Sequence, residues 1–351
     1  MSSHSSGHPR VSVVVRTRNR TDLLRRAIDD IFAQTLQNFE LVIVDDADDP
    51  SAVSALVASL PHSHRERCRV VSRAGEPHGR WLAANAGLDV ATGDYISLHD
   101  DDDWWDEHFL QTTVAYLDAH PETAAVCTRT MIAVERPDAA GELQTSDTYA
   151  FQPDLDSINV AEMLRANRIP PISMLYRHAL HTELGPYDSS LSYLGDWDFY
   201  LRVVSVHPIA LLDGPPLAFW SHRPESTGDE SNSIAVARAR AATEAGIRDA
   251  SLRRGIAEHG ISVFLQTAHE AHRIELLAAE QADGVRRSLD EQNHLLVEQL
   301  DAIRGRFDEV MGAVEDLRGE LARLRSEMYV RTSVTDVVLR PLRSLRARRR
   351  G

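Results

Sequence analysis

The chain contains no lysine, and all 38 of its basic residues are arginine. This absence excludes Schiff-base and pyridoxal phosphate catalysis, and it also excludes the lysine of a phosphate-binding P-loop. Cysteine is almost absent, since Cys68 and Cys127 are the only two and lie far apart in the sequence. Neither a disulfide framework nor a cysteine zinc site fits that spacing, and a reducing compartment is expected.

Long hydrophobic runs are also missing. No stretch approaches the roughly 20 apolar residues of a membrane-spanning helix. The apolar run from Val11 to Val15 is broken by Arg16 and is too short for the core of a signal peptide. These absences predict a cytoplasmic chain.

Acidic residues outnumber basic ones, 53 to 38, so the formal net charge of the 351 residues is −15. A general nucleic-acid binder needs a basic surface, so we expect no nucleic-acid partner. Any nucleotide that this chain binds would have to be bound locally, together with a cation. The length exceeds one average domain, which predicts one large globular unit plus an additional part.

Strand and helix patterns alternate through the N-terminal part of the chain. Short β-branched runs occupy residues 11–15, 41–44, 69–72 and 95–98, and helical apolar spacing occupies residues 21–34 and 81–90. This alternation predicts an α/β fold with a parallel sheet covered by helices on both faces.

Polar clusters follow three of these strands. The residues are Thr17, Arg18 and Asn19 after the first strand, Asp45 and Asp46 after the second, and Asp100 to Asp103 after the last. Ligands of such sheets bind beyond the carboxyl ends of the strands. The three clusters should therefore meet at one edge.

The run from Asp100 to Asp103 places four carboxylates side by side. They repel one another and remain ionised only if solvated or neutralised by a cation. Mg²⁺ and Mn²⁺ prefer such oxygen ligands. The alternative is an acidic helix start, with Asp103 capping a helix from Trp104 to Ala119, but capping accounts for only one or two of the aspartates.

In this order and spacing, the motifs resemble those of the inverting family 2 glycosyltransferases. The resemblance covers Val11 to Arg223 and implies the GT-A fold, a Rossmann-like, mixed but mainly parallel sheet with helices on both faces. The segment 11–20 resembles the opening strand and nucleotide loop, with Arg16 where proline is usual. The segment 41–46 resembles the second strand, and residues 100–102 are similar to the metal-binding Asp-x-Asp.

The resemblance implies a role for each matching residue. Residues implied to bind the nucleotide-sugar donor are Thr17, Arg18, Asn19, Asp45, Asp46, Arg80, Asp100 and Asp101. Residues implied to hold a divalent cation, Mn²⁺ or Mg²⁺, are Asp102, Asp100 and His222. For His222, a plain surface histidine is an equal alternative.

Two further segments depart from the family pattern. Ala84 stands where an arginine commonly precedes Asn85, and Arg80, one helical turn earlier, is a candidate for the lost phosphate contact or else a solvated surface residue. Gly195 replaces a glutamate before Asp196, which matches the catalytic base of the family. An inverting transfer needs one such carboxylate. The alternative for Asp196 is a helix cap, and its neighbour Asp198 is expected to be structural.

The C-terminal third is rich in Ala, Glu, Arg and Leu and has no proline from residue 234 until Pro341, which predicts long helices. A heptad seam indicates a left-handed coiled coil rather than one helix packed on its own domain. Asn293 at an a position favours a parallel homodimer. The seam residues are Leu289, Asn293, Leu296, Leu300, Ile303, Phe307, Val310, Val314, Leu317, Leu321, Leu324 and Met328.

After the seam, residues 329–351 carry seven arginines and one acidic residue. They predict a basic amphipathic element for an anionic membrane surface, divided by Pro341 into two short pieces; a disordered tail is the alternative. The predicted domains are a tail (1–9), the GT-A domain (10–233), a helical connector (234–288), the coiled coil (289–328) and the basic tail (329–351).

These observations predict a metal-dependent inverting glycosyltransferase. It would move a sugar from a nucleotide diphosphate, most simply a UDP-sugar, to a hydroxyl of a saccharide or lipid-linked acceptor. Bacterial polysaccharide or glycolipid assembly, at the inner face of the cytoplasmic membrane, is the setting that the resemblance implies. The alternative is a non-catalytic coiled-coil scaffold with a vestigial sugar-nucleotide fold. No motif encodes the sugar, the base or the acceptor.

Overall fold

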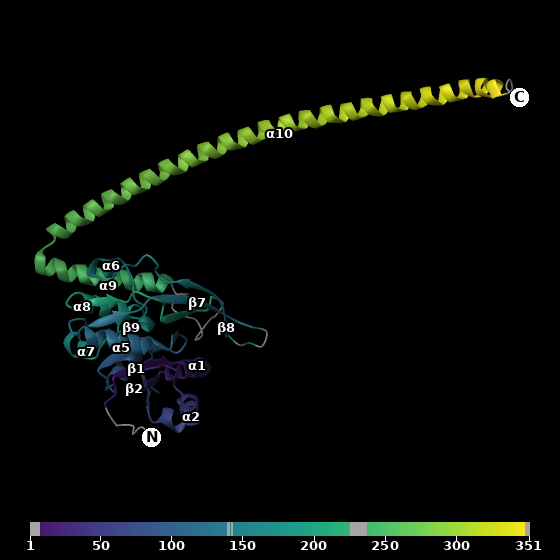
Figure 1. Cartoon of the computed structure of the whole chain (residues 1–351). Helices are drawn as coiled ribbons and strands as arrows, with labels where there is room; N and C mark the ends of the chain where they lie inside the picture. The colour runs from purple at the N-terminus through teal and green to yellow at the C-terminus, as the bar shows by residue number, and fades with distance from the viewer. Residues whose placement is uncertain (1–7, 139–140, 142, 225–236, 348–351) are drawn as a thin grey trace. The chain divides into compact units, whose positions relative to one another are not determined.

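The computed structural model describes residues 8–138, 141, 143–224 and 237–347 (Figure 1). The chain divides into two compact units, residues 1–254 and residues 255–351.

The first unit contains a mixed, seven-stranded sheet. Its order is β10 (Ile209–Leu211), β6 (Ala125–Cys127), β9 (Met174–Arg177), β4 (Tyr95–Asp100), β1 (Val11–Thr17), β2 (Phe39–Asp45) and β3 (Cys68–Ser72). Strand β9 runs antiparallel to its neighbours β4 and β6, and every other described pair in this sheet is parallel. This confirms the predicted α/β class with a mainly parallel sheet.

A four-stranded sheet lies in the same unit. Its order is β5 (Trp104–Trp105), β11 (Ala218–His222), β7 (Thr130–Pro137) and β8 (Leu143–Ala150). Strand β5 follows the aspartate run directly, and the next helix, α5, begins only at Phe109. The helix start considered for Trp104 is therefore wrong, because pairing with β11 holds this segment extended.

Helices cover the large sheet on both faces. One core contains side chains of α1 (Thr21–Phe32), α2 (Ser51–Ser59) and α5 (Phe109–Ala119). The other contains side chains of α4 (Arg80–Leu88), α6 (Val160–Arg165), α7 (Ala179–Leu184) and α8 (Gly195–Val204). The short helices α3 (His62–Arg65) and η1 (Pro171–Ser173) complete the fold.

The alternation of buried residues along the strands produces these two cores. In β1, Val13 and Val15 belong to the first core, whereas Val14 belongs to the second. Helix α4 packs especially close, since a Cβ on Gly87 would lie 2.4 Å from a methyl of Val14 and 2.9 Å from one of Val44. At the other end of α4, the backbone N–H of Gly79 donates to Asp46 at 2.9 Å, which places the N-terminus of α4 beside the end of β2.

Helix α9 (Ala237–His259) begins in the first unit. The guanidinium of Arg248 donates to the backbone oxygens of Leu164 and Arg165, each at 2.8 Å. It also lies 5.1 Å from the ring centre of Trp197. The N-terminal part of α9 is therefore held against α6 and α8.

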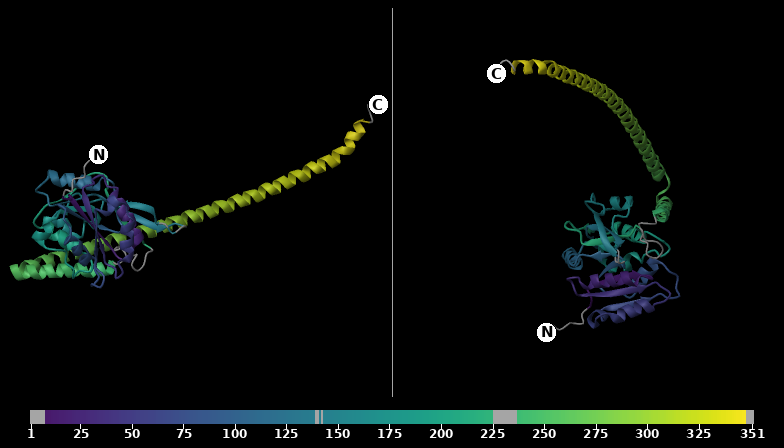
Figure 2. Two further views of the ribbon diagram at one scale, coloured as in Figure 1. Left: turned by 90° about the horizontal axis from the view of Figure 1, so that it is seen from below. Right: turned by 90° about the vertical axis from the view of Figure 1, so that its right-hand side faces the viewer.

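The second unit is dominated by α10 (Ser262–Ala347), an 86-residue helix that is unbroken in each view of Figure 2. Helix α10 continues through Pro341, so the expected division of the tail into two short pieces is wrong. Proline lacks a backbone N–H, but the loss of that one donor does not end the helix here. Side chains beyond residue 329 lie outside the described residues. No helix in the described part of the chain is long and apolar enough to cross a membrane.

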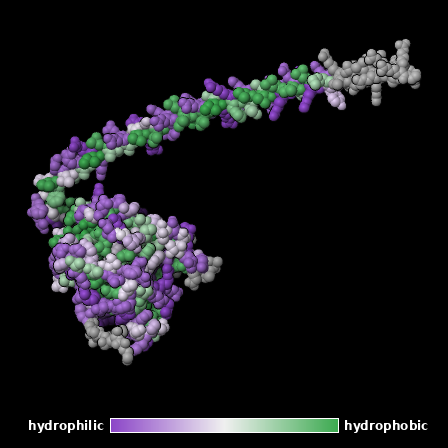
Figure 3. All heavy atoms as spheres, in the orientation of Figure 1, coloured by the Kyte–Doolittle hydropathy of each residue, from purple (hydrophilic) through white to green (hydrophobic). Residues whose placement is uncertain are grey.

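Apolar side chains of the predicted seam are exposed along α10. Leu300 is 63% exposed and Leu321 is 62% exposed. Figure 3 shows apolar side chains recurring along this helix among polar ones. In a single chain the seam is therefore uncovered.

Candidate functional site

The carboxyl ends of β1, β2 and β4 meet at a cavity of about 280 Å³, here called the first cavity. The predicted convergence of the polar clusters thus occurs, because β1 pairs with both β2 and β4 and places Arg16 opposite Asp100. The lining residues are Arg16, Thr17, Arg18, Arg20, Asp46, His78, Gly79, Arg80, Ala83, Asp100, Asp102 and Trp220.

The two aspartates after β2 differ in position. Asp46 lines the first cavity, forms an ion pair with Arg73 and accepts the Gly79 backbone N–H at 2.9 Å. Asp45 is fully buried, is absent from the lining and accepts the Ala47 backbone N–H at 3.1 Å. Burial raises the pKa of Asp45. Of this pair, only Asp46 lines the cavity.

The loop after β1 contributes two residues to the lining. Thr17 and Arg18 line the first cavity, whereas Asn19 does not. Asn19 has a positive φ of 56° and turns the chain from β1 into α1. Its position is that of a turn residue.

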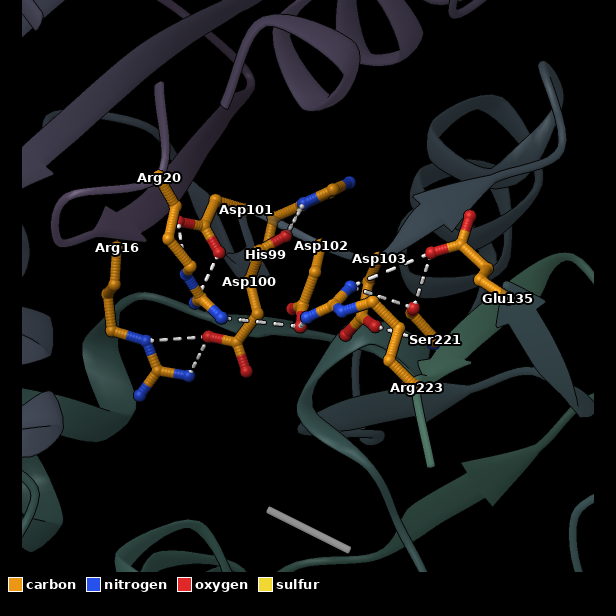
Figure 4. A network of polar contacts seen from close by, with 10 residues as sticks. All are labelled: Arg16, Arg20, His99, Asp100, Asp101, Asp102, Asp103, Glu135, Ser221 and Arg223. Carbon is orange, nitrogen blue, oxygen red and sulfur yellow. Dashed lines mark hydrogen bonds and ion pairs between the residues drawn. The ribbon is translucent and has the colours of Figure 1, made fainter. Parts of the chain in front are cut away.

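Arginines contact the carboxylates of the aspartate run, as Figure 4 shows. Arg16 donates from Nε to Asp100 at 3.0 Å, and Arg20 donates from Nε to Asp101 at 3.1 Å. Arg223, directly after β11, donates from Nη2 to Oδ2 of Asp102 at 2.5 Å. Buried carboxylates are thus neutralised by side chains from distant segments.

The pKa values of the aspartates diverge accordingly. Burial alone would raise the pKa of Asp100, but the guanidiniums of Arg16 and Arg80 outweigh it and hold this pKa below its usual range. Burial raises the pKa of Asp101 to about 7, against the attraction of Arg20. Burial, with the charges of Asp102 and Asp100, raises the pKa of Asp103 well above its usual range.

Three of the aspartates fit a divalent cation. Oxygens of Asp100, Asp102 and Asp103 lie within 4.8 Å of one another, and carboxylate oxygens are the donors that Mg²⁺ and Mn²⁺ prefer. Among the described residues, His222 does not belong to this group. Its neighbour Arg223 reaches Asp102 instead.

Asp101 and Asp103 are held away from the first cavity. Asp101 is 1% exposed and lines neither this cavity nor the second, described next. Asp103 accepts the backbone N–H of Ser221 at 2.9 Å, so it anchors β11 rather than capping a helix.

A second cavity, of about 140 Å³, adjoins the first, with which it shares Arg16, Arg80, Asp100 and Trp220. Asp196 lines it. The other residues that line it are Trp81, Phe151, Gln152, Asn167, Ile169, Pro170, Pro171, Tyr193, Leu194 and Arg240.

Asp196 is buried in the first turn of α8 and accepts a hydrogen bond from Nδ2 of Asn167 at 2.8 Å. Burial raises its pKa. The N-cap is Leu194 and no side chain caps this helix, so Asp196 is not the cap residue. Asp198 pairs with Arg202 at 3.0 Å, which is the structural role expected for it.

Arg80 and Trp81, at the start of α4, connect the two cavities. Arg80 is exposed, lines both cavities, and lies 5.6 Å from the ring centre of Tyr193. Ala84, which replaces the arginine of the family, is fully buried in the core. Arg16 lies 5.1 Å from the ring centre of Trp81.

Sequence reasoning assigned no role to several residues of the site, among them Arg20, Arg223, Asn167 and Trp81. A weak signal existed for two of them. Arg20 ends the loop after β1, and Arg223 immediately follows β11. Asn167 carried no signal, because it lies 29 residues before Asp196.

Comparisons with known proteins agree with this geometry. The family model described as "Glycosyl transferase family 2" matches residues 12–181. The chain is 28% identical over 198 residues to the uncharacterized glycosyltransferase YwdF of Bacillus subtilis, covering 55% of this chain and 67% of that protein. It is 26% identical over 198 residues to the PGL/p-HBAD biosynthesis glycosyltransferase of Mycobacterium tuberculosis, covering 56% and 70%.

Solved structures are more distant. S. aureus TarS 1–349 in complex with UDP-GlcNAc has 16% identity and a TM-score of 0.47, over 72% of this chain and 75% of that one. The mannosyltransferase PcManGT of Pyrobaculum calidifontis, in complex with GDP-Man and Mn²⁺, has 19% identity and a TM-score of 0.45, over 77% and 81%. Residues 12–181 thus match glycosyl transferase family 2, and the mixed, mainly parallel sheet with helices on both faces is the arrangement that the resemblance to this family predicts.

Proposed function

We propose that this glycosyltransferase is metal-dependent and inverting, and that it transfers a sugar from a nucleotide diphosphate to an acceptor hydroxyl. The observation that carries the proposal is the adjacency of the two cavities. The first contains Asp100 and Asp102, and the second contains Asp196 beside the shared Asp100. A donor in one and an acceptor in the other would meet at their common wall.

The first cavity suits a nucleotide-diphosphate sugar. Asp46 and the Thr17 loop would hold the nucleoside, and Arg16, Arg18 and Arg80 offer positive charge to the diphosphate. Arginine forks match phosphate oxygens well. We propose a UDP-sugar as the donor.

Asp102 and Asp100 would hold Mn²⁺ or Mg²⁺, with Asp103 within reach. When bound, the cation would neutralise charge on the leaving nucleoside diphosphate. For His222 to be a further ligand of the cation, its side chain would have to turn toward these aspartates.

Asp196 would act as the general base. Its carboxylate takes the proton of the acceptor hydroxyl while that oxygen attacks the anomeric carbon from the face opposite the diphosphate, which inverts the configuration. The N–H of Asn167 holds the carboxylate in orientation. A single displacement of this kind needs no covalent enzyme intermediate.

The second cavity suits a saccharide or lipid-linked acceptor, because aromatic rings contribute to its wall. They belong to Trp81, Phe151, Tyr193 and Trp220. Flat apolar faces of this kind can cover the C–H faces of a sugar ring. Bacterial polysaccharide or glycolipid assembly is the pathway class that we propose.

Helix α10 would join two copies of the chain in a parallel homodimer through its exposed seam. The basic residues 329–351 would then place two tails on an anionic surface, the inner face of the cytoplasmic membrane. The donor-binding domains would thereby lie near a lipid-linked acceptor.

The rival proposal is a non-catalytic scaffold. The experiment that separates the two is a release assay for free nucleotide, with UDP-, GDP- and TDP-sugars, Mn²⁺ or EDTA, and extracted bacterial glycolipid as acceptor. We expect release with one base, loss of release in EDTA, and loss in Asp102→Ala. A chain that neither releases nucleotide nor gains thermal stability from any donor with Mn²⁺ would support the scaffold.

A further inference from the structure

Two guanidiniums contact the carboxylate of Asp102, which is proposed as the main ligand of the cation. Oδ2 of Asp102 lies 2.5 Å from Nη2 of Arg223 and 3.5 Å from Nη1 of Arg20. The side chains of Asp102 and Arg223 are 7% and 6% exposed, and that of Arg20 is 17% exposed. Figure 4 shows the two arginines approaching Asp102 from opposite sides.

A divalent cation bound at Asp102 would be repelled by both guanidiniums. The repulsion between unit charges a few ångströms apart is strong where water is largely excluded. The cation can therefore bind tightly only if other negative charge takes over these arginines.

Each arginine has a different second partner. Arg20 is also paired with Asp101, to which its Nε donates at 3.1 Å. It lines the first cavity, where a donor diphosphate would lie, so its Nη1 can exchange the 3.5 Å contact with Asp102 for phosphate oxygens while the pair with Asp101 remains. Arg223 does not line that cavity, but its Nη1 lies 3.6 Å from the buried carboxylate of Glu135 and 3.1 Å from Oγ of Ser221. Glu135 can therefore retain Arg223 after Asp102 is taken by a cation.

We propose that Arg20 and Arg223 are resident counter-ions of Asp102, which couple cation binding to diphosphate binding. Mn²⁺ alone binds weakly, because it competes with both guanidiniums. A nucleoside diphosphate draws Arg20 away and makes the carboxylate available, so the two ligands strengthen each other's binding. This inference rests on the proposed function, since it presupposes a cation at Asp102.

The test is the affinity of the full chain for Mn²⁺, measured from the electron paramagnetic resonance signal of the free ion. Titrations are made without nucleotide and with saturating UDP, and with GDP in parallel, each corrected for Mn²⁺ bound by the nucleotide alone. The variant is Arg223→Gln. The matched control is Arg26→Gln, because Arg26 pairs with the same Glu135 at 2.5 Å but contacts no aspartate of the run.

We expect the wild type to bind Mn²⁺ at least about tenfold more tightly with one of the nucleotides than without it. Arg223→Gln should bind Mn²⁺ alone about tenfold more tightly than the wild type, with a smaller gain from nucleotide, whereas Arg26→Gln should match the wild type. If Arg223→Gln fails to fold in a thermal melt, Arg20→Gln serves in its place with the same expectation.

The inference is overturned if Arg223→Gln binds Mn²⁺ no more tightly than the wild type, or if the wild type binds it equally well with and without nucleotide. In the second case metal-dependent transfer survives and only the coupling fails. A wild-type chain that binds no Mn²⁺ under any of these conditions refutes both this inference and the metal dependence.

Discussion

Gly195 packs directly against the indole ring of Trp81, so that a Cβ at residue 195 would lie 2.7 Å from the ring and fit only if one of the two moved. The same ring lies beneath the guanidinium of Arg16, 5.1 Å from its carbon. Two departures from the family pattern, the glycine before Asp196 and the arginine in β1, are therefore connected through one tryptophan.

This contact makes a prediction for Gly195→Ala. In an ordinary helix the change stabilises, but here the added methyl must displace Trp81 or the first turn of α8, at a cost of about 1–3 kcal/mol in the free energy of unfolding. Urea unfolding of Gly195→Ala, Trp81→Ala and the double variant checks it. The double variant should be less destabilised than the sum of the two, and strict additivity would show that the contact is not the cause.

Asp196→Asn should separate binding from turnover. The amide has the same shape as the carboxylate and can still accept the hydrogen bond from Asn167, but it cannot take a proton from the acceptor hydroxyl. We therefore expect turnover to fall by about two or more orders of magnitude while the affinity for the donor persists. Calorimetric titration with the donor and a nucleotide-release assay give the two quantities. Retained turnover would show that Asp196 is not the base.

The pH dependence of the reaction should report the hydrogen bond from Asn167. A base acts when ionised, so kcat/KM falls as the pH drops through the pKa of Asp196, which burial raises above its ordinary value of 3.8. The Asn167 bond lowers this pKa by favouring the carboxylate. In Asn167→Ala the pKa rises further, so the acid limb of the profile should move to higher pH.

The control for that shift is Asn85→Ala. The side chain of Asn85 bonds the backbone N–H and carbonyl oxygen of Tyr187, and it lines neither cavity. Its variant should lose stability with no movement of the acid limb. An equal shift in both variants would mean that the profile reports folding and not the base.

Removal of residues 289–351 should leave a folded domain with a lower oligomeric state than the full chain. The seam residues are exposed in a single chain, and the α/β unit does not include them. Light scattering gives the measurement. A full-length chain that is monomeric at micromolar concentration would refute the proposed dimer. Distances between labels placed near the C-terminal end of α10 would test its orientation, since a large separation would show that the two helices are antiparallel.

Residues 329–351 should confer binding to anionic vesicles. Each arginine near an anionic surface contributes about 1 kcal/mol, so a dimer with two tails should bind measurably and release as salt rises. Flotation of the full chain and of a chain ending at Met328, with anionic and with neutral vesicles, tests this. Equal flotation of the two chains would exclude a role for the tail.

Local patterns in the sequence determined the fold class and the position of the site. Strand runs alternate with helical runs, so the parallel sheet was predictable, and polar residues after Val15, Val44 and His99 had to meet at one sheet edge. The long helices were equally predictable from the heptad spacing. Each of these signals lies within a short window of the chain.

The tertiary structure alone decided which charges meet. Arg223 lies 121 residues after Asp102, and their contact exists because β11 pairs with β5, directly after the aspartate run. The same pairing turned Trp104 and Trp105 into a strand and made Asp103 an anchor for Ser221. Such contacts are set by which strands become neighbours, and that choice depends on burial and pairing over the whole sheet, which no local spacing records.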